Sequence, residues 1–394
     1  MSRILIVNNN MHIGGVQKAL LNLLRSADPA NDITLLLLYK GGELLDQIPD
    51  SVTVIEADSP LRFWGMTKYD ISSKAELAER SFWAAMTRLF GRGVSFLMAA
   101  QSQQRLAGYD VAVSYLHSGN PKAFYGGCAE FVLQLVDAKR KICFLHNDFR
   151  QLNAVTKYNR RLYAGFDDIA ACSNGCRQAL LEVMPEFADK AEVVPNCIGY
   201  DEVRRMSTER QAVVDRSFVN IVTVARLGRE KGIIRAVKAM KRLADEGYSL
   251  HYYVIGDGPE RRAVQEAIRE MSLDGCISLM GEQTNPYPLV SACDLLLIPS
   301  YSEAAPLVVN EAACLGIPVL STKTSSSHEM IEKTGFGWVC DNTDDALCKA
   351  LSSLLDDPLK IESRHEMLLG RAFDDEGAVE RFEEVLAGGA HICQ

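Results

Sequence analysis

The chain has 394 residues, of which 47% are hydrophobic and 24% are charged, a composition typical of a globular α/β protein. A chain of this length is too long to fold around one ordinary hydrophobic core, so two domains are expected. The net charge of -9 argues against nonspecific binding to nucleic acid, and no apolar run reaches the length of a membrane span.

Residues 1–198 alternate buried strands with helices. Residues 3–9 (RILIVNN) form a continuous apolar run, as a parallel strand buried on both faces would, and Gly14 and Gly15 then open a helix. Further strands are expected at DITLLLLY, DVAVSYL, KICFLH, DIAACS and AEVVPN. This alternation of strand, turn and helix predicts a doubly wound, Rossmann-like domain.

Residues of about 60–106 break this rhythm as a helical insertion rich in aromatic residues. One interpretation is helices that pack on the domain with solvated charges. The other is a peripheral contact with an anionic membrane, because basic residues outnumber acidic ones here. The basic residues are Arg62, Lys68, Lys74, Arg80, Arg88, Arg92 and Arg105, against Asp70, Glu76 and Glu79.

The pattern restarts near residue 220 and predicts a second Rossmann-like domain over residues 199–375. Strands are expected at NIVTVARL, LHYYVI, CISLMG, DLLLIPS and PVLST, with a helix after the first that ends at Gly247. Residues 376–394 are expected to contain a final helix. The ligand of such a pair should lie in a cleft at the carboxyl ends of the strands.

The loops after these strands carry the candidate chemistry. Arg226, Arg229 and Lys231 follow the first of these strands. Pro306 fits the first position of the helix that follows the fourth strand. A helix N-terminus offers free N–H groups and partial positive charge, to which the cations would add. The combination predicts a diphosphate site that needs no metal, and the chain has no Asp-x-Asp.

Two acids lie eight residues apart on either side of Pro306. With Glu303 in the loop and Glu311 in the helix, they would flank the diphosphate and accept hydrogen bonds from the hydroxyls of a sugar and of a ribose. The alternative is that both acids are solvated at the surface.

Three motifs together resemble the retaining GT-B glycosyltransferases of glycosyltransferase family 4. They are VARLGREKG, VIGDGPE and EAAPLVVNE, in that order and spacing, and they cover most of the C-terminal half. The GGVQ turn near the N-terminus fits as well. The resemblance implies an α/β fold of two Rossmann-like domains facing across a cleft, with the acceptor on residues 1–198 and the nucleotide sugar on residues 199–375. The final helix is expected to return to the N-terminal domain.

The resemblance also implies roles for particular residues. The catalytic set is Glu303, Arg226, Lys231 and His146. The donor-binding set is Gly14, Gly15, Arg226, Lys231, Gly256, Glu282, Glu303, Ala304, Ala305, Pro306, Leu307, Val308 and Glu311. Ala304 departs from the glycine of many relatives. Simpler alternatives are a structural histidine at His146, a plain turn at GDGPE, and a Gly14–Gly15 turn that serves only packing.

The function that the resemblance implies is metal-independent transfer of a sugar, with retention of configuration, from a nucleotide-diphosphate sugar. UDP is favoured, no cofactor is expected, and the acceptor would be a glycan or a lipid-linked sugar of cell-envelope, capsule or exopolysaccharide synthesis. The alternatives are a nucleotide-sugar epimerase of the same architecture and a non-catalytic relative that only binds sugar nucleotides. The absence of a signal-peptide pattern at the N-terminus and the 11 cysteines, many in apolar runs, predict a cytoplasmic protein, with the inner face of the cytoplasmic membrane as one place where it could work.

Overall fold

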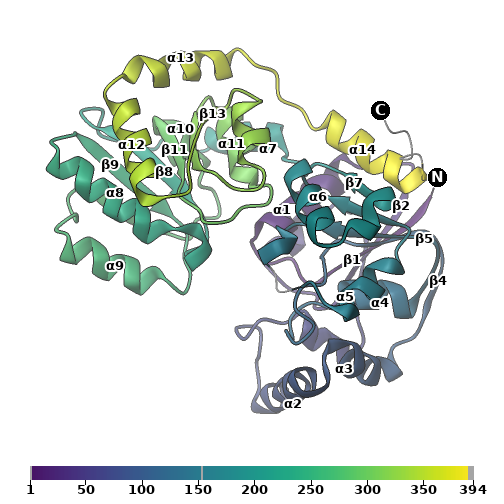
Figure 1. Ribbon diagram of the computed structural model, residues 1–394. Coiled ribbons are helices and arrows are strands. Elements are labelled where there is room, and N and C mark those ends of the chain that lie inside the picture. The colour runs from purple at the N-terminus through teal and green to yellow at the C-terminus, as the bar shows by residue number, and fades with distance from the viewer. Residues whose placement is uncertain (1, 152–153, 389–394) are drawn as a thin grey trace. The chain divides into compact units, whose positions relative to one another are not determined.

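The computed structural model describes residues 2–151 and 154–388. It divides the chain into two compact units, residues 1–197 with 375–394 and residues 198–374 (Figure 1). These limits lie beside the boundaries expected at residues 198 and 375. The last part of the expected C-terminal segment, residues 389–394, lies outside the described residues.

The N-terminal unit is built on a seven-stranded parallel sheet in the order β3-β2-β1-β4-β5-β6-β7. The order reverses between β1 and β4, which makes the carboxyl ends of these two strands the switch point of the sheet. The strands are β1 (Arg3–Asn8), β2 (Asp32–Leu37), β3 (Thr53–Glu56), β4 (Leu106–Ser114), β5 (Val136–Leu145), β6 (Asp168–Ala171) and β7 (Ala191–Val193).

Helices cover both faces of this sheet because side chains along β1 alternate between two cores. Ile4 and Ile6 belong to one cluster, which also contains Leu20 of α1 and Phe382 of α14. Leu5 and Val7 belong to the other, which contains buried residues of α3, α4 and α6. The helices are α1 (Gly15–Ser26), α2 (Lys74–Phe90), α3 (Arg92–Ala99), α4 (Cys128–Leu135), α5 (Lys157–Ala164), α6 (Asn174–Val183) and α14 (Glu376–Ala387).

The segment of residues 60–106 contains the helices α2 and α3, which lie side by side in Figure 1. Ser73 caps α2 through its hydroxyl, which accepts from the Glu76 amide, and Gly91 separates the two helices. Trp64 anchors the insertion by packing against the rings of Trp83 and Phe96. None of the helices in the described ranges is long and apolar enough to cross a membrane.

The C-terminal unit is built on a six-stranded parallel sheet in the order β10-β9-β8-β11-β12-β13. This is the Rossmann order, with its switch point between β8 and β11. The strands are β8 (Val219–Val224), β9 (Leu250–Ile255), β10 (Ile277–Gly281), β11 (Leu295–Ile298), β12 (Val319–Thr322) and β13 (Gly337–Cys340).

Two apolar clusters again cover the two faces of the sheet. One contains buried residues of α8, α9 and α12, and the other contains residues of α10, α11 and α13. The helices of this unit are α7 (Tyr200–Ser207), α8 (Ile233–Asp245), α9 (Arg261–Glu270), α10 (Tyr287–Ala292), α11 (Leu307–Cys314), α12 (Asp344–Leu355) and α13 (Pro358–Leu369). The expected fold class of two Rossmann-like α/β domains is confirmed.

Candidate functional site

The loops after β8, β9 and β11 close on one another at the switch point of the C-terminal sheet. Gly232 follows β8 with φ +64, and a Cβ there would lie 2.1 Å from the carbonyl oxygen of Pro299. Gly256 follows β9 with φ +139, and a Cβ there would lie 1.9 Å from the Ala225 oxygen. Both glycines are therefore required by close backbone approach in a conformation that L side chains rarely adopt.

Lys231 and Glu303 meet at this point. The Lys231 Nζ lies 2.7 and 2.9 Å from the two carboxylate oxygens of Glu303. The side chains are only 24% and 10% exposed, so water screens this pair less than a surface pair. The structure thus joins the loop after β8 to the loop after β11 through the two residues that the sequence had assigned to the donor site.

Several polar side chains that the sequence analysis did not single out fix Glu303. The Ser300 hydroxyl donates to its carboxylate at 2.7 Å, and the Ser325 hydroxyl donates to its backbone oxygen at 2.6 Å. Thr322 donates to the Ser300 carbonyl at 2.5 Å. The carboxylate of Glu303 is therefore held by Ser300, and the loop backbone is held by Thr322 and Ser325.

A buried arginine, Arg235, supports the loop after β11. Arg235 is 3% exposed, donates to Asp344 and Asn342 at 2.9 and 2.6 Å, and lies over the Tyr301 ring at 4.4 Å. The Asn342 amide in turn donates to the Tyr301 carbonyl at 3.1 Å. No sequence motif marks these residues, because their contacts join α8 to the start of α12 about a hundred positions later.

The three cations after β8 differ in their surroundings. Arg229 is 95% exposed and faces Glu260 at 3.5 Å. Of Arg229 and Lys231, it is therefore Lys231 that faces inward. Arg226 is 67% exposed and donates to Glu230 at 2.7 Å. An exposed pair of this kind contributes roughly 0–1 kcal/mol, so a stronger anion could displace Glu230 from Arg226 at little cost.

Glu311 lies on α11 and is 5% exposed. It accepts a hydrogen bond from the Tyr287 hydroxyl of α10 at 2.9 Å, and Tyr287 is a neighbour that the sequence did not indicate. Burial, with the Glu311 charge as the next cause, raises the pKa of Tyr287, which therefore stays a donor. This rules out the alternative of a solvated surface acid at this position.

The start of α11 differs by one residue from the expectation. Pro306 is the N-cap, with φ -69 and ψ 117, and Leu307 is the first helical residue, so the expected N1 position was wrong. The extended ψ of Pro306 ends the loop one residue later than a helical proline would. No side chain caps the first turn, which includes Leu307 and Val308 and follows Ala304 and Ala305.

The remaining expected donor residues are less informative. Glu282 follows β10 and is exposed. Gly15 begins α1 after its N-cap Gly14, and no atom lies within 4 Å of a Cβ built at Gly15. Packing between helix and strand therefore does not explain that glycine, which leaves its backbone open to approach.

His146 follows β5 in the N-terminal unit and is 8% exposed. Burial, aided by the neighbouring His117, lowers the pKa of His146 to about 3, so the ring is neutral near pH 7. It packs on Tyr115, at 4.9 Å between ring centroids, and its buried Nε2 has no partner among the described residues. A neutral ring with an unsatisfied nitrogen suits a ligand hydroxyl better than a purely structural role.

Comparison with solved structures defines the class of fold. The chain is similar to Anabaena Alr3699/HepE in complex with UDP, with a TM-score of 0.68 and 16% identity over 98% of this chain and 100% of that one. It is also similar to WaaG, a glycosyltransferase involved in lipopolysaccharide biosynthesis, with a TM-score of 0.60 and 16% identity over 98% and 100% of the chains. The chain therefore has the GT-B fold.

Sequence comparison finds similarity over the C-terminal unit. Residues 209–368, within the C-terminal unit, match the family model of glycosyl transferases group 1. The Escherichia coli (strain K12) putative colanic acid biosynthesis glycosyltransferase WcaL is 30% identical over 134 residues, 32% of this chain and 33% of that protein. The Erwinia amylovora amylovoran biosynthesis glycosyltransferase AmsK is 31% identical over 147 residues, 35% of each. The matched region thus spans about a third of these curated relatives.

Proposed function

We propose that this protein is a retaining, metal-independent glycosyltransferase that moves a sugar from a UDP-sugar to a glycan or lipid-linked acceptor of extracellular polysaccharide synthesis. The observation that carries the proposal is the largely buried Lys231–Glu303 pair at the switch point of a Rossmann-ordered sheet. A cation and an acid held together there suit a ligand with a diphosphate next to a sugar. The names of the polysaccharide-building relatives support the direction of the proposal.

In this mechanism the C-terminal unit binds the donor. Lys231, Arg226 and the amides at the start of α11 stabilise the negative charge that develops on the leaving diphosphate. Glu303, oriented by Ser300, binds hydroxyls of the transferred sugar, and Glu311 binds the ribose. The leaving phosphate takes the proton of the acceptor hydroxyl, so no protein nucleophile is needed.

The donor base can be tested by thermal unfolding. We expect UDP to raise the unfolding temperature more than GDP or ADP, since a ligand at a hundred times its dissociation constant adds about 2.7 kcal/mol to the stability of the native state. UDP-sugars would then be tried with acceptors, and the anomeric configuration of the product read by NMR. A protein that none of the three nucleotides stabilises would not fit the proposal, and an inverted product would contradict retention.

We further propose that the enzyme works at the inner face of the cytoplasmic membrane and contacts it through α2 and α3. The two helices expose apolar side chains, among them Leu77, Phe82, Leu89 and Phe90 on α2 and Val94, Leu97 and Met98 on α3. Exposed cations accompany them at Lys68, Lys74 and Arg88. The basic character is weaker than the sequence count indicated, because Arg62 is paired with Glu76 and Arg92 is buried. An apolar surface with a few cations suits an anionic bilayer.

Flotation with phosphatidylglycerol-containing vesicles tests this contact. We expect the protein to float with these vesicles at low salt, and the double variant Leu89→Ser with Phe90→Ser to lose most of that binding. The matched control is Val213→Ser, which removes an exposed apolar side chain of the C-terminal unit. Failure of the wild-type protein to float at low salt would remove the proposal.

A further inference from the structure

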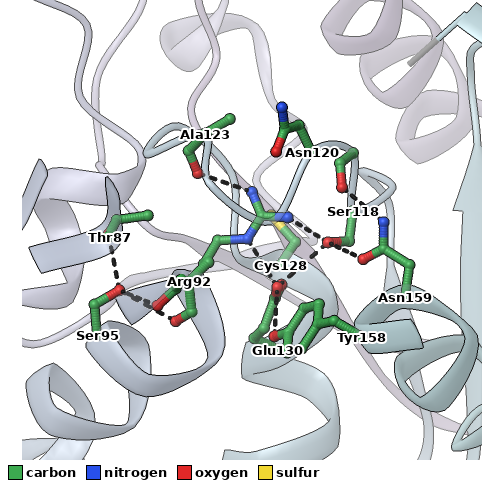
Figure 2. Close-up of polar contacts among 12 residues, drawn as sticks. Thr87, Arg92, Ser95, Ser118, Asn120, Ala123, Cys128, Glu130, Tyr158 and Asn159 are labelled. Atoms are coloured by element: carbon green, nitrogen blue, oxygen red, sulfur yellow. Dashed lines mark hydrogen bonds and ion pairs between the residues drawn. The ribbon is translucent and has the colours of Figure 1, made fainter. Parts of the chain in front are cut away.

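A fully buried ion pair lies inside the helical insertion of the N-terminal unit. The Arg92 Nε of α3 donates to Glu130 Oε1 of α4 at 2.8 Å, and the side chains are 1% and 0% exposed (Figure 2). Taking both charges out of water costs several kcal/mol per ion, which their attraction does not always recover. Moreover, Glu130 Oε2 has no partner among the described residues. Stability alone therefore explains this pair poorly.

Arg92 forms hydrogen bonds with several residues of one loop. This loop, residues 116–127, follows β4 and is named the β4 loop. The guanidinium Nη1 donates to the carbonyls of Ala123 and Tyr125, each at 3.3 Å, and the Nη2 donates to the Ser118 hydroxyl. The Arg92 backbone amide donates to the Pro121 carbonyl at 2.7 Å. Figure 2 shows the guanidinium lying between the loop and Glu130. One residue thus contacts the loop at positions spread along its length.

Helix α5 also holds the β4 loop, near the start of the loop. The Asn159 amide donates to the Gly119 carbonyl at 2.7 Å, and the Tyr163 hydroxyl donates to the Ser118 carbonyl at 2.8 Å. Tyr158 donates to Glu130 Oε1 at 3.0 Å, which ties the carboxylate to the same helix. These contacts use backbone atoms of the loop, so they define its shape and leave side chains such as Lys122 and Tyr125 exposed.

The β4 loop lies at the switch point of the N-terminal sheet. It begins at the carboxyl end of β4, and the Tyr125 hydroxyl accepts from the Asn10 amide, just after β1, at 3.0 Å. Two buried polar atoms near these strand ends, Asn9 Nδ2 and His117 Nδ1, have no partner among the described residues. Unsatisfied buried groups beside a rigid loop with an exposed aromatic ring indicate a place for a hydroxyl-rich ligand.

We propose that Arg92 and Glu130 are positioning residues that hold the β4 loop in the shape that receives the sugar acceptor. This inference rests on the proposed glycosyltransferase function. The positioning role needs the planar guanidinium of Arg92. Its N–H groups point in fixed directions and reach a carboxylate, a hydroxyl and two carbonyls at once, which a lysine ammonium does not.

The first experiment measures amide hydrogen exchange by mass spectrometry in wild type, Arg92→Lys and Arg140→Lys. We expect Arg92→Lys to speed exchange in peptides covering residues 116–127 by about 10-fold, because the loop loses its shared anchor. Arg140→Lys is the matched control, since Arg140 pairs with the buried Asp168 at 2.7 Å on neighbouring strands and does not touch the loop. Glu130→Gln, which keeps the side-chain shape but removes the charge that pairs with Arg92, should also speed exchange in residues 116–127 and replaces Arg92→Lys if that variant fails to fold.

The second experiment measures steady-state transfer from a UDP-sugar to p-nitrophenyl glycosides and to lipid-linked sugars extracted from bacterial membranes. We expect the Arg92→Lys variant to raise the KM for the acceptor about 10-fold while the KM for the donor stays within about twofold, since only the acceptor geometry is disturbed. Arg140→Lys should change neither constant.

The outcomes separate the two proposals. Unchanged exchange in residues 116–127 overturns the positioning role, whether or not the protein is a glycosyltransferase. Faster exchange with an unchanged acceptor KM, or with equal changes in both KM values, overturns the link to the acceptor. A wild-type protein that binds no nucleotide and transfers to no acceptor overturns the proposed function and with it the acceptor role, while the exchange measurement still decides what Arg92 holds.

Discussion

Replacing Lys231 with alanine is expected to lower kcat by about 10²–10³-fold, the usual cost of removing one group that stabilises charge in a transition state. The Lys231 Nζ is fixed beside Glu303 at 2.7 Å, and its side chain is 24% exposed. Because the Lys231 ammonium is partly dehydrated, we expect it to act on the leaving diphosphate of the proposed mechanism more strongly than a cation in water. Release of UDP from a UDP-sugar, followed with saturating acceptor, measures the loss.

Arg229→Ala is the matched control for this substitution. It removes a cation from the same short helix, Arg229–Lys231, but that cation is 95% exposed, so kcat should stay within about twofold. Because Lys231 also holds Glu303, a double-mutant cycle with Glu303→Ala separates the direct effect of the ammonium from misplacement of the carboxylate. Equal kcat in Lys231→Ala and Arg229→Ala would show that Lys231 does not act on the diphosphate.

The sequence predicted every strand of the two sheets except one edge strand in each. Every N-terminal strand was expected except β3, whose residues Thr53 and Glu56 are exposed at the end of the sheet. In the C-terminal unit β13 was missed in the same way, because it is a short edge strand that begins at a glycine. An edge strand has fewer buried neighbours and carries a weaker apolar signal, but the other two edge strands, β7 and β10, were expected from their sequences.

For the donor residues, the loops could be predicted from the sequence, but the orientation of the side chains could not. The sequence placed Arg226, Arg229 and Lys231 in one loop, and spacing alone left undecided which of Arg229 and Lys231 faces inward. The structure separates them through the contact of Lys231 with Glu303, 72 residues away. Ser300, Tyr287 and Asn342 were missed for a related reason, since single polar residues outside a motif look alike until the chain is folded.

Arg92 is the clearest case of a residue whose burial and pairing could not be predicted from the sequence. It was counted with the basic residues of the insertion and is instead buried against Glu130, 38 positions later. A count of charges in a segment reports composition and does not distinguish a solvated arginine from a paired one. The roles assigned to Glu303, Glu311 and His146 stay predictions, and so does the cleft between the two domains.

Replacing Glu311 with glutamine is expected to weaken UDP binding by about 10- to 100-fold, since a hydrogen bond to a charged group contributes about 1.5–3 kcal/mol and the proposed ribose contact uses this carboxylate. The substitution suits the site because the buried side chain already accepts from Tyr287 at 2.9 Å, and an amide oxygen can keep that bond. Titration calorimetry with UDP measures the change.

Two further variants show whether this loss belongs to the ribose contact. Tyr287→Phe removes the internal hydrogen bond but leaves the carboxylate, so it should lower the unfolding temperature more than the affinity for UDP. Glu303→Ala should lower turnover by a larger factor than it lowers UDP affinity, because Glu303 is assigned to the transferred sugar, which UDP lacks. If Glu303→Ala and Glu311→Gln weakened UDP binding equally, the division of roles between the two acids would be wrong. The donor would then lie differently on the unit from the way that the Lys231–Glu303 pair suggests.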